Sequence, residues 1–318
     1  MVRPGGRQGT PGTSEVQTWT ADPATTTSYR LAEGPVWDPW RRRLLWVDIE
    51  AGEVLEGAVE ARSVHEVRRL GFPGTVGAVA VAVDGTLLVA AQETLVVVAP
   101  DGTRREGPRV VPRGQRRRLN DGAADPAGRF LVGTLCLDGD SEHEVLVRWE
   151  HDGTLSALDD DLTLSNGLAW STDGKLLYSV DTERRVIHVR DYDVATGAVG
   201  ARRSFVVLTD GLPDGIAVDA EDHVWVAVWG AGEARRYSPD GALVGRVLVA
   251  APQVSCVAFA GDDLSLLVVT TAADGLTPEQ LEEHPDSGRL FVVGVDVPGH
   301  LPAPWQPPVP MTQGDPCV

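Results

Sequence analysis

Apolar and polar positions follow one another along the chain in a short pattern that returns six times. Each copy contains a strand of alternating apolar character, a turn rich in Asp, Gly and Pro, and a second strand that is almost entirely apolar. Residues of these turn types tolerate or preset the backbone angles that tight turns require. Continuous apolar strands such as 44–47 and 224–227 are typical of strands covered on both faces. The pattern therefore predicts repeated β units.

The first strand of each copy begins with a characteristic group, which in several copies is an acid or amide followed by glycine. Successive groups lie 41 to 48 residues apart, close to the spacing of propeller blades. Six two-strand units without a long helical pattern predict an all-β fold, a six-bladed β-propeller. The six groups are Glu33-Gly-Pro-Val-Trp, Gly77-Ala-Val-Ala-Val, Asn120-Asp-Gly-Ala-Ala, Asn166-Gly-Leu-Ala-Trp, Asp214-Gly-Ile-Ala-Val and Ser255-Cys-Val-Ala-Phe.

One propeller accounts for the whole length of 318 residues. We predict that it spans residues 15–297, after a flexible Gly/Pro/Thr-rich tail at 1–14 and before a Pro-rich C-terminal tail at 298–318. The C-terminal tail is expected to lie extended on the surface or to be disordered. One short helix is predicted from Pro278 to Glu283, with Thr277 as its N-terminal cap.

Glu33, Asn166 and Asp214 occupy equivalent positions in three copies of the repeat. Equivalent positions of successive blades converge on the central channel, so these side chains are expected to meet there. Two carboxylates and an amide are hard oxygen donors, which suit Ca²⁺, Mg²⁺, Mn²⁺ or Zn²⁺. Three protein ligands leave coordination positions open for water or substrate. The repeat therefore predicts one divalent metal ion on the axis.

The third copy can be aligned in two ways, with either Asn120 or Asp121 in the channel position. Both are expected near the mouth of the channel. Because neighbouring strand residues face opposite sides, one is expected to point inward and the other to lie behind it. Gly77 and Ser255 cannot ligate a metal strongly, so the pocket is expected to be open on the sides of the second and sixth blades.

The formal net charge of −18 argues against nucleic acid and anionic membranes as partners. No apolar run is long enough to cross a bilayer, and no apolar leader follows the first residues. The three cysteines form no Cys-x-x-Cys pair, which with the missing leader favours reduced thiols and a cytoplasmic location. No obligate protein partner is evident. No Gly-x-Ser-x-Gly motif is present, which disfavours serine-hydrolase chemistry.

The same residues resemble the gluconolactonase, regucalcin and senescence-marker-protein family over roughly residues 30–295. The matching segments are 33–37, Arg118-Leu-Asn-Asp-Gly122 with 125–129, Ser165-Asn-Gly-Leu-Ala-Trp170, Pro213-Asp-Gly215, Ser255-Cys256 and Asp274-Gly-Leu-Thr-Pro278 running on to 288–291. The resemblance implies a six-bladed propeller with one divalent metal near the axis, and hydrolysis of sugar lactones.

Carried over by position, the metal ligands of the family fall on Glu33, Asn166 and Asp214, and its proposed general acid/base on Asp214. Its substrate contacts fall on Arg118, Asn120 and, less securely, Asp138. Animal members have glutamate at the last position and another acid where this chain has Leu137. This difference leaves the preferred sugar undefined. In the family the first strand, here about 15–21, closes the last blade.

The predicted function is therefore metal-dependent hydrolysis of a sugar lactone, with the metal as a Lewis acid. Either Asp214 or the metal activates the attacking water, and the sequence leaves both accounts open. Two other functions remain open as well. One is a phosphotriesterase-like hydrolase on the same scaffold, and the other is a non-catalytic propeller that binds calcium or a small molecule.

Overall fold

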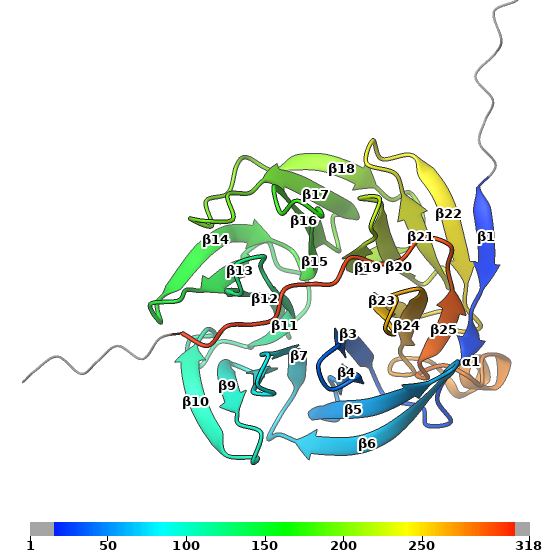
Figure 1. The fold of residues 1–318 in the computed structure, drawn as a ribbon, viewed down its shortest axis with the longest axis horizontal. Coiled ribbons are helices and arrows are strands. Elements are labelled where there is room, and N and C mark those ends of the chain that lie inside the picture. Colours follow the sequence, from blue (N-terminus) through cyan, green and yellow to red (C-terminus); the bar gives the residue numbers. More distant parts are fainter. Residues whose placement is uncertain (1–15, 309–318) are drawn as a thin grey trace, which may run out of the picture.

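The computed structural model describes residues 16–308, which form six antiparallel sheets arranged as a ring (Figure 1). This confirms the predicted all-β six-bladed propeller. In every blade the first strand lies nearest the axis and the later strands follow outward in chain order. The strands of the first three blades are β3 (Ala32–Asp38), β4 (Arg43–Asp48), β5 (Glu53–Glu60) and β6 (Ser63–Gly71); β7 (Val76–Val81), β8 (Leu87–Ala91), β9 (Thr94–Val98) and β10 (Arg104–Arg109); and β11 (Arg117–Ala124), β12 (Phe130–Cys136), β13 (Glu144–Trp149) and β14 (Leu155–Leu162).

The other three blades repeat this order with small variations at the N-terminal strands. Their strands are β15 (Ser165–Trp170), β16 (Leu176–Asp181), β17 (Val186–Asp191) and β18 (Arg203–Val207); β19 (Leu212–Val218), β20 (Val224–Trp229), β21 (Glu233–Tyr237) and β22 (Leu243–Leu248); and β23 (Val254–Ala260), β24 (Leu266–Thr271) and β25 (Phe291–Gly294). The sixth blade obtains its outer strand from the beginning of the described chain.

The ring is closed by β2 (Asp22–Pro23), which pairs with β25. The expectation that residues 15–21 close the last blade is wrong. Instead, β1 (Gln17–Thr20) runs parallel to β22 and adds a fifth strand to the fifth blade. Aromatic packing explains this choice, because the rings of Trp19 and Trp225 lie 5.4 Å apart. Gly245 makes room for Trp19, since a Cβ at this glycine would lie 2.7 Å from its ring.

The hydrophobic core lies between neighbouring blades rather than at one central point. One cluster, for example, joins Leu45 and Val47 of the first blade to Val79 and Val89 of the second. This packing explains the continuous apolar strands, since the second strand of a blade is covered on both faces. Helix α1 (Pro278–Glu283) lies outside the ring, and its cap at Thr277 is present as predicted. No helix within residues 16–308 is long and apolar enough to span a membrane.

The innermost strands define two ends of the channel. We call the end where they begin the acidic end, because Glu33, Asp121 and Asp214 lie there, and the end where they finish the strap end. The predicted tail at 1–14 lies outside the described residues, as does 309–318. The domain boundaries at 14 and 297 stay a prediction.

Residues 298–308, which we call the strap, cross the strap end of the propeller (Figure 1). The strap is extended, but it is also anchored by hydrogen bonds and packing. His300 N–H donates to Val218 O at 3.0 Å on the fifth blade, and Trp305 N–H donates to Val81 O at 3.0 Å on the second. Trp305 is 2% exposed and stacks on Trp149. The Pro-rich segment is therefore part of the packed structure up to residue 308.

Candidate functional site

The candidate site lies where every innermost strand is interrupted by a β-bulge or a similar irregularity. The pairing register with the second strand shifts within each of the six motifs that the sequence repeats. A bulge inserts an unpaired residue and redirects side chains, and bulges are enriched beside active sites. The shifts lie between Glu33 and Val36, Val76 and Ala78, Leu119 and Gly122, Asn166 and Leu168, Pro213 and Ile216, and Val254 and Cys256.

Glycine follows the polar residue because the innermost strands approach one another closely here. Gly167 has a φ of +27°, and a Cβ on it would lie 2.5 Å from the carbonyl oxygen of Asp214 on the next blade. A side chain at this position would push the fourth and fifth blades apart. The recurring acid-or-amide–glycine pair therefore serves both the site and the packing of the ring.

Gly77 and Ser255, the small residues of the second and sixth motifs, make close contacts between blades. A Cβ on Gly77 would lie 2.4 Å from the carbonyl oxygen of Asn120, so this glycine is in close contact with the third blade. Ser255 is fully buried, and its hydroxyl donates to the carbonyl oxygen of Ala32 at 2.6 Å. Small residues at these two positions therefore fit the packing of neighbouring blades.

Glu33, Asp121 and Asp214 form a cluster of acids at the acidic end of the channel. Burial, followed by the charge of Asp121, raises the pKa of Glu33 to about 8, and burial raises the pKa of Asp121 to about 6. Burial and the charges of both other acids raise the pKa of Asp214 well above its usual value. The charge of the nearby Arg118 only partly offsets this effect, and in the absence of a cation the cluster holds protons at neutral pH.

Backbone contacts satisfy part of this cluster and leave one oxygen free. The N–H of Gly34 donates to Glu33 Oε2 at 2.6 Å, and the N–H of Gly122 donates to Asp121 Oδ1 at 2.7 Å. Asp214 is 7% exposed, and its Oδ1 is buried without a hydrogen-bond partner. A buried carboxylate oxygen without a donor is costly, which indicates that something absent from the bare chain completes the site.

The ambiguity in the third copy is resolved by the bulge, because both residues lie at the site. Asn120 Nδ2 donates to Asn166 Oδ1 at 3.0 Å and to the carbonyl oxygen of Ser165 at 2.9 Å. Asp121 contributes its charge to Glu33 and Asp214. Both residues of the third copy therefore lie at the site, as expected.

Asn166 is held in one orientation by partners on both sides of its amide. Its Nδ2 donates to Thr182 Oγ1 at 3.1 Å, and the Thr182 hydroxyl donates to the carbonyl oxygen of Pro213 at 2.9 Å. Its Oδ1 accepts from Asn120 and retains a second lone pair, which is available to a cation. Thr182 thus positions a predicted ligand. It escaped the sequence analysis because it follows a second strand, outside the repeated motif.

Arg118 lies beside the cluster, and it is buried. Its Nη1 donates to Asn120 Oδ1 at 2.6 Å and to the carbonyl oxygen of Leu119 at 3.1 Å. Burial lowers the pKa of its guanidinium, against the opposing charges of Glu50, Glu33 and Asp214. Within residues 16–308 no acid lies close enough to form an ion pair with Arg118. Its charge therefore remains available to a ligand.

Asp138 is the one predicted site residue that lies apart from the buried group. It follows β12 on the rim of the acidic end, is largely exposed, and pairs with Arg116 Nε at 2.5 Å. Cys256, by contrast, is buried and lies against the cluster, within hydrogen-bonding reach of Glu33, although the sequence analysis did not place it at the site. Its position directly after Ser255 in the sixth motif was the available signal.

The donor set fits a divalent cation of the hard class. Glu33, Asp214 and Asn166 offer carboxylate and amide oxygens, and the unpartnered Asp214 Oδ1 gives a direct place for a cation. Within residues 16–308 no three His, Cys, Asp or Glu side chains are already arranged to hold a metal. The proposed ligand set contains only two such side chains, Glu33 and Asp214, and needs the amide oxygen of Asn166 as its third ligand. In the bare chain, Glu33 and Asp214 contact each other.

Comparison with known proteins gives consistent matches over most of the chain. A family model described as SMP-30/Gluconolactonase/LRE-like region matches residues 31–273. Pentonolactonase XacC of Haloferax volcanii is 39% identical over 279 residues, which cover 86% of this chain and 94% of that protein. Regucalcin of Sus scrofa is 32% identical over 297 residues, with the same coverage of 86% and 94%.

Among solved structures, a calcium-binding protein, regucalcin, from Agrobacterium tumefaciens superposes with a TM-score of 0.86 at 26% identity. The match covers 92% of this chain and 100% of that one. The similarity therefore extends over the whole ring of blades.

Proposed function

We propose, from the premise that the chain belongs to the SMP-30/gluconolactonase/LRE-like family, that it hydrolyses sugar lactones with the help of one divalent cation. The family match covers residues 31–273, and the relative that is 39% identical is named a pentonolactonase. We therefore propose a pentonolactone as the first substrate to test. Other aldonolactones of five- and six-membered rings come next.

One observation of the site carries this proposal. Two buried acids, Glu33 and Asp214, lie together with the half-buried Asp121 and with one unpaired guanidinium beside them, and one carboxylate oxygen, Asp214 Oδ1, has no partner. Buried structural acids are normally paired, because an unpaired charge is costly to bury. An unpaired group with raised pKa values is typical of a functional site.

The proposed ligands are Glu33, Asn166 and Asp214. A divalent cation held there would polarise the lactone carbonyl and lower the pKa of a water molecule. Attack of water on the carbonyl carbon breaks the ring C–O bond. The ring oxygen takes a proton and becomes a hydroxyl, and the carboxylic acid product loses a proton to solvent.

Asp214 is the proposed proton acceptor for the attacking water. One of its oxygens would bind the cation, and the other would orient the water and accept its proton. Ligation lowers the proton affinity of the carboxylate, so Asp214 acts as a weak base. Without a cation, burial and the charges of Glu33 and Asp121 raise the pKa of Asp214 instead, so a cation and a proton compete for this carboxylate.

Arg118 and Asn120 are the proposed contacts of the sugar. Both amide hydrogens of Asn120 are engaged, one by Asn166 and one by Ser165. Asn120 can therefore accept a hydrogen bond from a sugar hydroxyl, but it has no donor left. Arg118, which Asn120 orients, is the group that donates to the hydroxyls or the ring oxygen of the substrate.

A screen of aldonolactones tests the proposal. Hydrolysis releases a proton, so a weakly buffered indicator reports it, and a blank with cation and lactone alone corrects for spontaneous opening. We expect EDTA to abolish turnover and one divalent ion per chain to restore it. Failure of every pentono- and hexonolactone to open faster than the blank, with Ca²⁺, Mg²⁺, Mn²⁺ and Zn²⁺ each supplied, would refute lactonase activity.

A second candidate function is calcium binding without turnover. It is favoured by the all-oxygen donor set and by the similar solved protein described as calcium-binding. Saturable binding of Ca²⁺ by calorimetry, without hydrolysis in the lactone screen, would support this function over the first.

A further inference from the structure

A cavity of about 390 Å³ fills the channel between the acidic end and the strap. Its inner end is formed by Asp121 and Cys256, and its outer end by strap residues such as Leu301 and Pro304. Arg118 and Asn120, the proposed contacts of the sugar, do not line it. The cavity therefore lies on the other side of the acid cluster from the proposed lactone site.

The wall of this cavity is apolar over most of its length. Ala217 and Ala258 belong to innermost strands at the centre of the molecule and are nevertheless partly exposed, because part of their surface faces the cavity. Trp37 and Phe259 also line it. A buried water molecule needs two to four polar partners, and a wall of this kind offers few. The space is therefore poorly suited to water.

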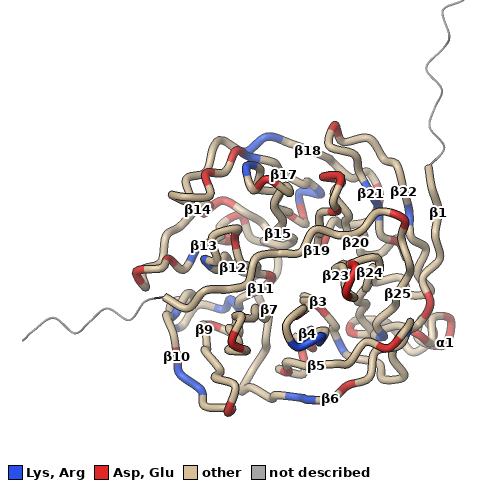
Figure 2. Tube along the Cα trace, viewed as in Figure 1, with Lys and Arg blue, Asp and Glu red and all other residues tan. Residues whose placement is uncertain are grey.

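The outer end offers an aromatic entrance without charge. Trp40, in the turn after the first innermost strand, lines the cavity and is 46% exposed. The strap carries no Lys, Arg, Asp or Glu from residue 298 to 308, as the uncoloured segment crossing the ring in Figure 2 shows. His300 is the one strap residue lining the cavity that can carry a charge, and Asp121 at the inner end disfavours anions.

We propose that this cavity is a second binding site, for a small uncharged molecule with an aromatic ring. Its volume lies within the range of about 300–1,000 Å³ that is common for small-molecule sites. Apolar walls and tryptophans stabilise a ring through burial and stacking. A charged group would lose its hydration here without a compensating partner. The site is independent of the lactone site and of the proposed lactonase function.

A neutral fluorescent probe tests this site directly. The full-length protein is titrated with 6-propionyl-2-(dimethylamino)naphthalene, which carries an aromatic ring and one carbonyl, and whose emission shifts to the blue in apolar surroundings. We expect a saturable blue shift with one probe per chain. Ala258→Phe, which fills the cavity, should weaken binding by about tenfold or more. Ala242→Phe adds the same ring on an exposed turn and should leave binding unchanged.

The proposal would be overturned if the wild-type protein gave no saturable blue shift, or if Ala258→Phe bound the probe as tightly as the wild type. It would also be overturned if Ala242→Phe lost as much probe affinity as Ala258→Phe. Displacement of the probe by a lactone substrate would also overturn it, because the probe would then occupy the acidic end. Circular dichroism and thermal unfolding report whether Ala258→Phe folds. If it does not, Ala217→Leu fills the cavity from the fifth blade, and the same outcomes apply.

Discussion

The innermost strands of the first, third and fifth blades each have an acid near both ends, and the two acids have opposite surroundings. Near the acidic end, Glu33, Asp121 and Asp214 lie together without an ion pair in residues 16–308. At the strap end, Asp38, Asp125 and Asp219 are fully buried, and each pairs with an arginine of its own blade. Burial alone therefore does not distinguish a functional acid from a structural one.

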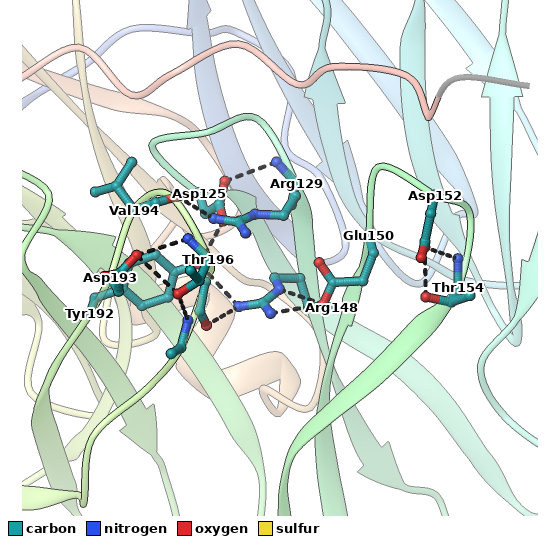
Figure 3. A network of polar contacts seen from close by, with 12 residues as sticks. Asp125, Arg129, Arg148, Glu150, Asp152, Thr154, Tyr192, Asp193, Val194 and Thr196 are labelled. Carbon is teal, nitrogen blue, oxygen red and sulfur yellow. Dashed lines mark hydrogen bonds and ion pairs between the residues drawn. The ribbon is translucent and has the colours of Figure 1, made fainter.

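Asp125 shows how completely a structural acid is satisfied. Its Oδ1 accepts from the backbone N–H groups of Ala127 and Arg129, each at 2.9 Å, and its Oδ2 accepts from Arg129 Nε at 2.6 Å and from the Tyr192 hydroxyl at 2.5 Å (Figure 3). Tyr192 belongs to the next blade, so this acid also joins two blades. Asp214, by contrast, leaves one oxygen without any partner.

Removing the charge of Asp125 should have the largest effect on stability. We expect Asp125→Asn to lower the free energy of unfolding by about 3–5 kcal/mol, because Arg129 then remains buried without its counter-charge. Asp152→Asn is the matched control, since Asp152 is an exposed turn residue near the same network (Figure 3). It should change stability by less than about 0.5 kcal/mol. Urea unfolding measures both, and equal effects would contradict the comparison.

The unpaired acids should make the cation-free protein less stable as the pH rises. Glu33 has a pKa of about 8 in the folded chain, far above its value in an unfolded chain. Between these two values the folded state holds more protons, so stability is highest near pH 5 and falls toward pH 8. The slope is about 1.4 kcal/mol per pH unit for each extra proton held. Thermal unfolding in EDTA across this range measures it.

The same experiment with a divalent cation provides the control. A bound cation displaces the protons, so its stabilising effect should grow with pH and flatten the profile. An identical pH profile with and without cation would mean that the acid cluster does not bind it.

Asp214→Asn should change stability in the opposite sense from Asp125→Asn. In EDTA at pH 8 it removes an unpaired acid, and we expect the melting temperature to stay equal or rise. The variant should lose the stabilisation by cation, which for the wild-type protein is about 2.7 kcal/mol at a hundredfold excess over Kd. Asp219→Asn, at the other end of the same strand, should instead lower the melting temperature and keep the response to cation.

Arg118→Ala separates sugar binding from cation binding. We expect kcat/KM to fall by about 1.5–3 kcal/mol, the usual loss for a hydrogen bond from a charged donor. The affinity for the cation, measured by calorimetry, should stay close to the wild-type value. Arg113→Ala, an exposed arginine before the same strand, should alter neither quantity. A loss of cation binding by Arg118→Ala would place Arg118 among the groups that support the ligands.

The fold could be predicted from the sequence because the six motifs repeat at blade spacing. The contact between Glu33 and Asp214 followed from that repeat. The convergence of Asn166 with them at one metal ion stays a prediction. The sequence also placed both Asn120 and Asp121 near the channel mouth. The bulges themselves could not be predicted, because they depend on pairing with a second strand.

Contacts between distant segments also escaped the sequence. Thr182 positions a ligand from a turn outside the repeat, and Gly77 fits a close approach of two blades. The strand at 17–20 pairs with the fifth blade because Trp19 packs on Trp225. Such contacts depend on shape complementarity in three dimensions, which the pattern of apolar and polar residues along the chain does not encode.

Asp138 should give the smallest effect, and it tests how far the site extends beyond the buried group. Its carboxylate is exposed and paired with Arg116, and exposed ion pairs contribute about 0–1 kcal/mol. We expect Asp138→Asn and Arg116→Gln each to change stability by less than about 1 kcal/mol. If Asp138 contacts the sugar, as the resemblance to the family implies, Asp138→Asn lowers kcat/KM while Arg116→Gln does not. If the two variants instead change kcat/KM equally little, Asp138 forms only the exposed ion pair with Arg116 and does not contact the sugar. The substrate contacts would then be limited to Arg118 and Asn120.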